Sequence, residues 1–411
     1  NGPTGPVSNA RRPIVVSVPA TNVAAINEGR KRRQAKQARR DTRRRATSHL
    51  QTPERSALMR DVRAALDAGH PLDLLVLVST LIEAVTPDRL AFRKTGQRQQ
   101  VCLKDLIAGF VGTQIRETTA LLAVLSEFLV DDEELQRICA QEMANRPHRL
   151  PRWIAGLPGI QVRRIARMAH LLGDSDELLI GARLIGGQEL TCVVRLDHNV
   201  ISGLDDAFVV ADSIDNVRDA AVETNTDPDV SFVEMTLADA RAWIQHGLMR
   251  TAFPRLSESW ANCRPLVRWL IGHMPEGGHA YERPCDDWPA TSRLLETFFT
   301  SPQGRPFNRF DHEELLAELL DTGCGDPLRW SVARVQQALG GLDYLDDHMP
   351  VECVLDAPDL LRAFIPVAHA LSGIREQLTA RALDMISEME PAFQRRIVAE
   401  AKRWDDELWA V

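Results

Sequence analysis

The stretch ELLIGARLIGGQELTCVVRLDHNVISGLDDAFVV, residues 177–210, decides the predicted fold class. Within it, Glu177–Leu184, Glu189–Leu196 and Asp206–Val210 are rich in apolar residues and are bounded by residues typical of turns, which predicts three strands. Gly186–Gly187 separates the first two strands and is a good signal for a tight hairpin turn. The stretch therefore predicts a small antiparallel sheet.

Helices flank these strands in the prediction. Val162–Leu172 has the spacing of an amphipathic helix, and a second helix follows a cap at Asp212 or Ser213. The resulting order, α-β-β-β-α, is also that of the double-stranded RNA-binding domain. That family places a lysine cluster at the start of its second helix, whereas this chain has DSIDN at residues 212–216. The similarity therefore rests on the order of elements alone.

The rest of the folded chain predicts helices on both sides of this insert. Thr52–Pro53 provides a cap and a proline at the first helical position, and seven helical segments follow from Leu237 onward. We therefore expect a mainly α fold with a small α+β insert that contains a three-stranded antiparallel sheet. The expected regions are a disordered basic arm at 1–46, a helical domain at 52–150, an α+β domain at 151–235 and a C-terminal helical domain at 236–411.

Charge is divided unevenly along the 411 residues. The chain has a formal net charge of −8, but residues 1–45 carry twelve Lys or Arg against two acidic residues, a net +10. The remaining residues carry 37 basic and 55 acidic side chains, a net −18. A basic segment on an acidic body indicates binding to a polyanion.

The sequence RKRRQAKQARRDTRRR, residues 30–45, carries the basic charge. A dense array of guanidinium groups pairs with phosphates and releases counterions, so we expect docking on a nucleic acid or on a ribonucleoprotein such as the ribosome. A solubilising tail or an acidic protein partner is the alternative; a membrane surface fits less well, because the segment has no Trp, Phe or Leu to insert. The candidate nucleic-acid-binding residues are Arg30, Lys31, Arg32, Arg33, Lys36, Arg39, Arg40, Arg43, Arg44 and Arg45.

Several classes of protein find no support in the sequence. No apolar run approaches the roughly 18 to 20 residues that span a membrane. The seven cysteines are spread singly and include no CxxC, which argues against a disulfide framework and favours a reducing cytoplasm. The chain has no GxxxxGK(S/T), no GxGxxG after a strand and no GxSxG. We therefore predict no cofactor and favour a cytoplasmic, non-enzymatic binding protein.

An acidic loop region offers an alternative function. Asp197, His198, Asp205 and Asp206 surround a predicted strand end, where carboxylates and an imidazole could bind a divalent metal in a hydrolase or nuclease. The competing interpretation is turn chemistry, in which Asp side chains accept hydrogen bonds from nearby backbone. No metal-ligand spacing such as HxH or HExxH supports the first interpretation, so we favour the second.

Two further alternatives rest on scattered residues. Cys263, His273, His279 and Cys285 have the ligand types of a zinc site, but their gaps are longer than those of structural zinc motifs. A helical adaptor that binds proteins through an apolar groove is the second alternative. Its groove would be lined by tryptophans, for which burial in the core is the simpler expectation: Trp243, Trp260, Trp269, Trp288 and Trp330.

Four stretches, read together with the basic leader, carry a resemblance to a known family. They are HPLDLL at residues 70–75, DHN at 197–199, DAFVV at 206–210 and GDPLRWS at 325–331. The chain is similar here to a family of uncharacterised proteins from high-GC Gram-positive bacteria, the actinobacteria, from about Gly29 to the C-terminal region. The resemblance implies one evolutionary unit with several subdomains in a bacterial cytoplasm, and it implies no activity, cofactor or site.

Overall fold

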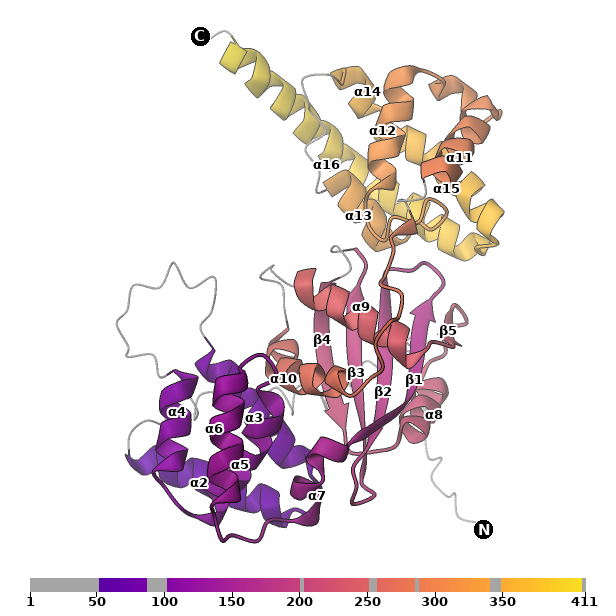
Figure 1. Cartoon of the computed structure of the whole chain (residues 1–411). Helices are drawn as coiled ribbons and strands as arrows, with labels where there is room; N and C mark the ends of the chain where they lie inside the picture. Colours follow the sequence, from indigo (N-terminus) through magenta and orange to yellow (C-terminus); the bar gives the residue numbers. More distant parts are fainter. Residues whose placement is uncertain are drawn as a thin grey trace, which may run out of the picture.

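The computed structural model describes six segments of the chain: residues 52–86, 102–199, 203–250, 257–284, 288–340 and 349–408. Figure 1 shows a group of helices at the N-terminal side, a sheet in the middle and a second group of helices over one end of the strands. The predicted basic arm, residues 1–46, and Cys285 lie outside the described segments.

The N-terminal group is built around a buried helix. Its members are α2 (Thr52–Asp67), α3 (Leu72–Val85), α4 (Leu103–Val111), α5 (Arg116–Phe128) and α6 (Glu133–Ala144). Helix α3 is largely buried and packs against α10 (Glu258–Gly272). Its hydroxyl groups are satisfied, because Thr80 donates to the Val76 carbonyl and Ser79 donates to the Asn262 carbonyl of α10. The N-terminal helices thus share one hydrophobic core with the sheet region.

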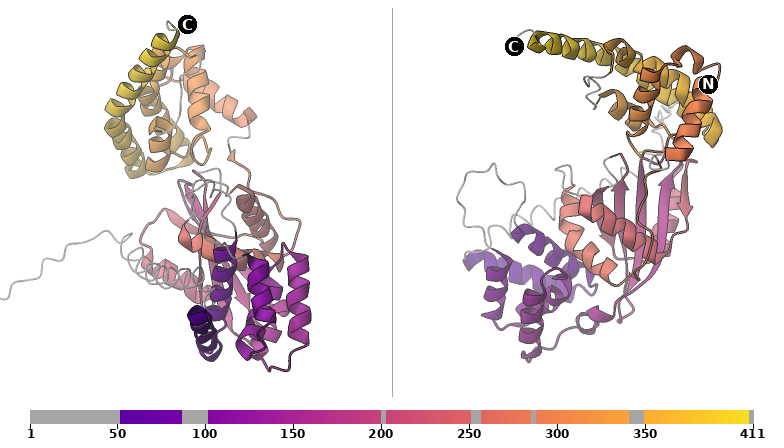
Figure 2. Two further views of the ribbon diagram at one scale, coloured as in Figure 1. Left: turned by 90° about the vertical axis from the view of Figure 1, so that its left-hand side faces the viewer. Right: turned by 45° about the horizontal axis from the view of Figure 1, so that its top comes forward.

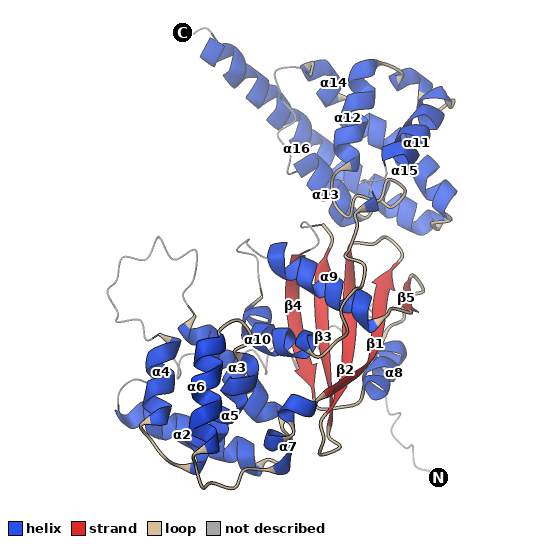
Figure 3. Cartoon of the chain, viewed as in Figure 1, coloured by secondary structure: helices blue, strands red, loops and turns tan. Residues whose placement is uncertain are grey.

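A five-stranded antiparallel sheet occupies the middle of the molecule, in the order β4-β3-β2-β1-β5 (Figure 3). Helix α7 (Arg152–Ala155) and the 3-10 turn η2 (Leu157–Gly159) lead into it. The predicted glycine hairpin joins β2 to β3, with the Leu184 N–H donating to the Gln188 carbonyl and Gly187 at a φ of 87°. The strands are β1 (Gln161–His170), β2 (Ser175–Arg183), β3 (Glu189–Asp197), β4 (Gly203–Val210) and β5 (Val230–Val233).

The predicted fold class, mainly α with a three-stranded insert in α-β-β-β-α order, is wrong, because the described chain is a mixed α/β structure with a five-stranded sheet. Most of its described residues are helical, as predicted. Residues 162–172 were expected to form a helix, but most of this range belongs to β1. Strand β5 was not expected. β1 is rich in Arg, Ala and Met, which favour helices, and its burial does not alternate because elements cover parts of both faces. Pairing with a strand on each side overrides the local preference.

Helices cover the two faces of the sheet unequally. Helices α9 (Leu237–Arg250) and α10 pack on one face, and the shorter α8 (Ile214–Thr224) packs on the other. The predicted cap of α8 is confirmed, because the Ser213 side chain accepts the Asn216 N–H. Helices α9 and α10 lie within the residues predicted as the C-terminal helical domain, 236–411, but their apolar side chains belong to the core of the sheet.

The C-terminal helices have a hydrophobic core of their own. Figure 2 shows this group over one end of the strands, with the last part of α16 extending away from it. Trp330 is fully buried there, and Trp260 and Trp269 are buried in α10, as expected for core tryptophans. None of the described helices has the length and apolar character to cross a membrane. The elements are α11 (Trp288–Thr300), η4 (Arg305–Phe307), α12 (Phe310–Leu320), α13 (Val332–Gly340), α14 (Val351–Leu355), α15 (Ala357–Ser372) and α16 (Glu376–Leu408).

The seating of α8 on the sheet gives a first prediction. A Cβ at Gly181 of β2 would lie 2.9 Å from the Cβ of Ile214, so Gly181→Ala should push α8 away from the sheet. We expect the free energy of unfolding, measured in urea, to fall by roughly 1 to 3 kcal/mol, the usual cost of overpacking. Gly272→Ala is the control, because a Cβ there meets no atom within 4 Å. An unchanged stability for Gly181→Ala would mean that α8 does not rest on Gly181.

Candidate functional site

The four residues of the predicted acidic site lie near the β3–β4 connection but face different surroundings. Asp206 accepts hydrogen bonds from Ser257 (2.8 Å) and Ser259 (2.5 Å) at the start of α10. Asp197 accepts the Asn199 N–H at 2.9 Å, which is the predicted turn chemistry. Both carboxylates therefore have a local structural role, one at a helix start and one in a turn.

Asp205 is the extra residue of a β-bulge in β4. Arg195 pairs with Asp206 and Leu196 with Leu204, so Asp205 has no partner in the strand ladder. Its carboxylate lies 3.2 Å from Arg195 Nη1. Burial, and after it the neighbouring carboxylates of Asp197 and Asp206, raise the pKa of Asp205 to about 6 against the pull of Arg195. The carboxyl therefore keeps its proton to a higher pH in the folded protein than an ordinary aspartate does.

His198 turns away from these carboxylates into a buried polar cluster. Its Nε2 lies 2.8 Å from Asp176 Oδ2, and Arg167 Nε lies 3.0 Å from the other oxygen of Asp176. Burial alone would raise the pKa of Asp176, but the hydrogen bond with His198 and the charge of Arg167 outweigh it and lower the pKa. His198 is 2% exposed and Asp176 is 3% exposed, so neither side chain is open to a substrate.

Aromatic rings seal this cluster. Tyr281 stacks on His198 with ring centroids 4.3 Å apart, and Trp243 of α9 meets Tyr281 edge-on at 4.9 Å. The guanidinium of Arg167 lies over the Trp243 ring at 4.8 Å. Tyr281 belongs to the segment between α10 and α11, so the cluster anchors that connection to the end of the sheet.

The same end of the sheet contacts the C-terminal helices. Ser331 donates to Asp174 Oδ1 at 2.6 Å, and Leu172 packs with Ile374 and Leu378. Asp174 and Leu172 lie in the β1–β2 turn, while the other three residues lie in the C-terminal part. Polar and apolar contacts together form the interface between the sheet and the C-terminal helices.

One group of described residues has the geometry of a metal site, but its hydrogen bonds oppose that role. The ligand atoms of His170, Asp227 and Asp229 lie within 4.8 Å of one another. His170 Nδ1 accepts the Leu172 N–H at 3.0 Å, so in the neutral ring Nε2 carries the proton and offers no lone pair. Arg375 Nε lies 2.9 and 2.8 Å from the two oxygens of Asp229 and lowers its pKa. The group is better explained as an ion-pair network that joins the sheet to α16.

The described members of the predicted zinc set point to separate partners. Cys263 is buried inside α10, and His273 Nδ1 lies 2.9 Å from the Trp269 carbonyl at the end of that helix. His279 is exposed and contacts Asp239 at 3.2 Å. These contacts hold no two of the three residues together, and Cys285 lies outside the described segments.

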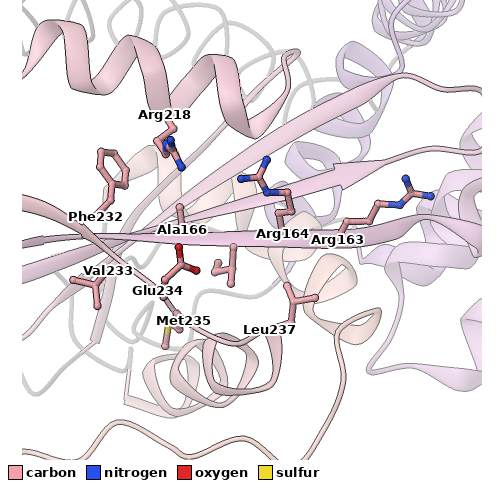
Figure 4. Close-up of a pocket in the computed structure, with 10 residues that line it drawn as sticks. Arg163, Arg164, Ala166, Arg218, Phe232, Val233, Glu234, Met235 and Leu237 are labelled. Carbon is pink, nitrogen blue, oxygen red and sulfur yellow. The ribbon is translucent and has the colours of Figure 1, made fainter.

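An arginine-rich cleft, lined by β1, α8, the end of β5 and the residues that follow it, including the acidic Glu234, is the candidate that sequence reasoning missed. It has a volume of about 230 Å³ (Figure 4). Arg163 and Arg164 come from β1 and Arg218 comes from α8, which places three cations at one cleft of an acidic body. In the sequence these arginines look like the polar side of a helix, so no local pattern signals the cleft.

Comparisons with known proteins add no assignment to this geometry. No family model matches the chain, and neither a curated protein nor a solved structure matches it. The resemblance to an actinobacterial family therefore stays an expectation from the sequence.

The buried cluster gives a second prediction. Asp176→Asn removes a charge that His198 and Arg167 both contact, so we expect the free energy of unfolding to fall by about 2 to 4 kcal/mol near neutral pH. The folded pKa of Asp176 is lowered, so its stabilisation is present above the unfolded pKa and is lost as the pH falls through the folded pKa. Urea unfolding at several pH values measures both effects. The exposed Asp219→Asn is the control; equal effects of the two variants would contradict the structural role.

Asp205 gives a third prediction of opposite sign. Its folded pKa of about 6 lies above the ordinary value of 3.8, so ionisation between these values costs stability as the pH rises. We expect Asp205→Asn to stabilise the protein above about pH 7, by up to roughly 3 kcal/mol, and to have little effect near about pH 4. Thermal unfolding across this pH range measures the difference. A variant that is less stable than the native protein at neutral pH would show that the ionised carboxylate is needed.

Proposed function

We propose that this protein binds a nucleic acid through Arg30–Arg45 and acts as a binding protein rather than an enzyme. The observation that carries the proposal is the division of charge, with a net +10 in residues 1–45 and a net −18 in the remainder. The proposed partner is RNA or DNA, free or within a ribonucleoprotein such as the ribosome, in a bacterial cytoplasm.

Electrostatics explain why such a division suits docking. Each arginine that neutralises a phosphate releases condensed counterions, which makes binding favourable and sensitive to salt. The acidic body repels the same phosphates, so contact is concentrated at the basic segment. The planar guanidinium also forms two parallel hydrogen bonds to phosphate oxygens, which a lysine ammonium does not.

The contacts of the acidic residues favour binding over hydrolysis. His198 is sealed beneath Tyr281, Asp206 accepts hydrogen bonds at the start of α10, and Asp197 closes a turn. These structural contacts explain why His198, Asp206 and Asp197 occur here without a role in a hydrolase or nuclease site. The apolar groove of the adaptor alternative loses three of its candidate residues to the core, namely Trp260, Trp269 and Trp330.

The proposal predicts that neutralising the arm abolishes salt-sensitive binding. We expect full-length protein in which the ten Lys and Arg of residues 30–45 are replaced by Gln to bind single-stranded RNA at least roughly a hundredfold more weakly at about 100 mM salt. The slope of log K against log salt should also become much shallower, because its steepness counts neutralised phosphates. Fluorescence anisotropy of a labelled oligonucleotide measures both quantities.

A matched variant of the body is the control for this experiment. Arg163→Gln together with Arg218→Gln removes cations from the cleft and leaves the arm intact, so the affinity and the salt slope should stay near native values. An unchanged slope in the arm variant would refute docking through residues 30–45. Binding of DNA and RNA oligonucleotides of equal length separates the two kinds of nucleic acid.

A further inference from the structure

We infer that the free edge of β1 is a docking site for an extended acidic peptide of a partner protein, which would add a strand to the sheet beside α8. The free edge is the part of β1 before Arg167, on the side that faces β5. This inference concerns a different part of the molecule from the basic arm and does not depend on the proposed function.

The pairing of β1 defines this edge. β2 pairs with β1 from Gln161 to Ala169, whereas β5 pairs with it from Arg167 to His170. Within the segments that the structure describes, no strand pairs with the earlier residues of β1 on the β5 side. The sheet therefore ends in a strand whose first half has a neighbour on one side.

The direction of the backbone groups follows from the register. The Leu171 N–H donates to the Asp229 carbonyl at 2.8 Å, so the odd-numbered residues of β1 direct their N–H and C=O groups toward β5. Ile165 is the next such residue beyond the paired segment. It presents one donor and one acceptor at the free edge, which is the pattern that an added strand recognises.

The arginine-rich cleft lies along this edge. It is lined by Arg163–Ala166 of β1, by Arg218 of α8 and by residues 232–235 and Leu237 at and after the end of β5, among which Glu234 is acidic. Figure 4 shows Arg218 extending from α8 toward the strand near Ala166, with Met235 and Leu237 on the opposite side of β1. An added strand would thus meet Arg218 and Phe232 on one side, and Glu234, Met235 and Leu237 on the other.

Three arginines against the one carboxylate of Glu234 leave the cleft lining with a positive balance, which favours an acidic occupant. Arg163 and Arg164 are exposed, and the ion pair of Arg218 with Asp219 is long, at 3.9 Å. Arg164 contacts Asp215 through Nη1, which leaves its other N–H groups uncommitted to that carboxylate. A carboxylate on alternate residues of a bound strand would meet these guanidinium groups, since alternate side chains point to the same face.

Backbone chemistry favours a peptide over a nucleic acid at this edge. A peptide strand offers both N–H and C=O groups, so it satisfies the carbonyl and the amide of Ile165. Phosphate groups offer acceptors alone, so a nucleic acid lacks the regular N–H and C=O groups that match the amide and the carbonyl of Ile165. Charged side chains on an edge also prevent unwanted strand pairing, and this simpler explanation predicts no binding.

The test uses a labelled hexapeptide that alternates glutamate and valine, with the full-length protein in native and arm-neutralised forms. The arm-neutralised form is needed because an acidic peptide also meets the basic residues 30–45 by simple charge attraction. We expect the peptide to bind the arm-neutralised chain in fluorescence anisotropy. We also expect slower amide hydrogen exchange in residues 161–167 when it is bound.

Two changes separate strand addition from charge attraction. Two methylated peptides are compared, each with N-methyl groups on alternate amides. The one whose methyl groups fall on the side facing β1 loses its hydrogen-bond donors to the strand and should bind at least about tenfold more weakly. Arg163→Gln with Arg218→Gln should weaken binding to a similar extent, whereas Arg137→Gln on the exposed side of α6 should not change it.

Each contrary result overturns the inference. No binding by the arm-neutralised chain would mean that the arginines protect the edge. Equal binding of the two methylated peptides would mean that no strand is added, and equal binding of a peptide with lysine in place of glutamate would mean that charge does not select the occupant. A failed arm experiment with a successful peptide experiment would refute nucleic-acid docking and leave this inference intact.

Discussion

Strand β1 has a neighbouring strand on both sides for part of its length and on one side for the rest. This difference determines where the sheet meets the C-terminal helices and where the cleft lies. From Arg167 to Ala169 both β2 and β5 flank the strand, and beyond this stretch the chain leads into the interface with the C-terminal helices. Where β5 ends, the chain turns away toward α9 and the arginine-rich cleft opens. The short length of β5 therefore decides which part of β1 supports structure and which part can bind.

The buried polar cluster of Asp176, His198 and Arg167 fixes the relative positions of the strand ends more than it adds to the free energy of unfolding. Burying the Asp176 charge is costly, and the contacts with His198 and Arg167 offset that cost without a large net gain. The cluster acts only when the β1, β2 and β3 ends are in register and Tyr281 is in place above them. Together with the Arg375–Asp229 pair it defines how the C-terminal helices sit on the sheet.

The sequence predicts correctly the turn and the helix cap that depend on neighbouring residues. It does not predict the elements that depend on contacts between distant residues. The Gly186–Gly187 turn and the Ser213 cap are local, so composition alone predicted them. The helical preference of β1 is also local, but pairing with β2 along most of the strand and with β5, sixty or more residues away, overrides it. The loop before α13 is also held by contacts that no local pattern predicts. Buried Arg334 of α13 donates hydrogen bonds to the carbonyls of Leu320 and Arg329. The cleft combines side chains of β1 with one of α8, so no spacing in the sequence predicts it.

The basic arm and the free edge of β1 recognise their proposed partners by different interactions, so both can function on one chain. The arm relies on many equivalent charges, so its affinity depends on salt and hardly on the sequence or shape of the polyanion. The free edge relies on one amide, one carbonyl and three arginines held by β1 and α8, so its occupant must match a spacing. The acidic body around the cleft repels nucleic acid and long acidic segments alike, and only a short segment can approach the arginines closely. A short, extended acidic peptide is therefore recognised at the edge by strand pairing, whereas at the arm it competes with a polyanion through charge alone.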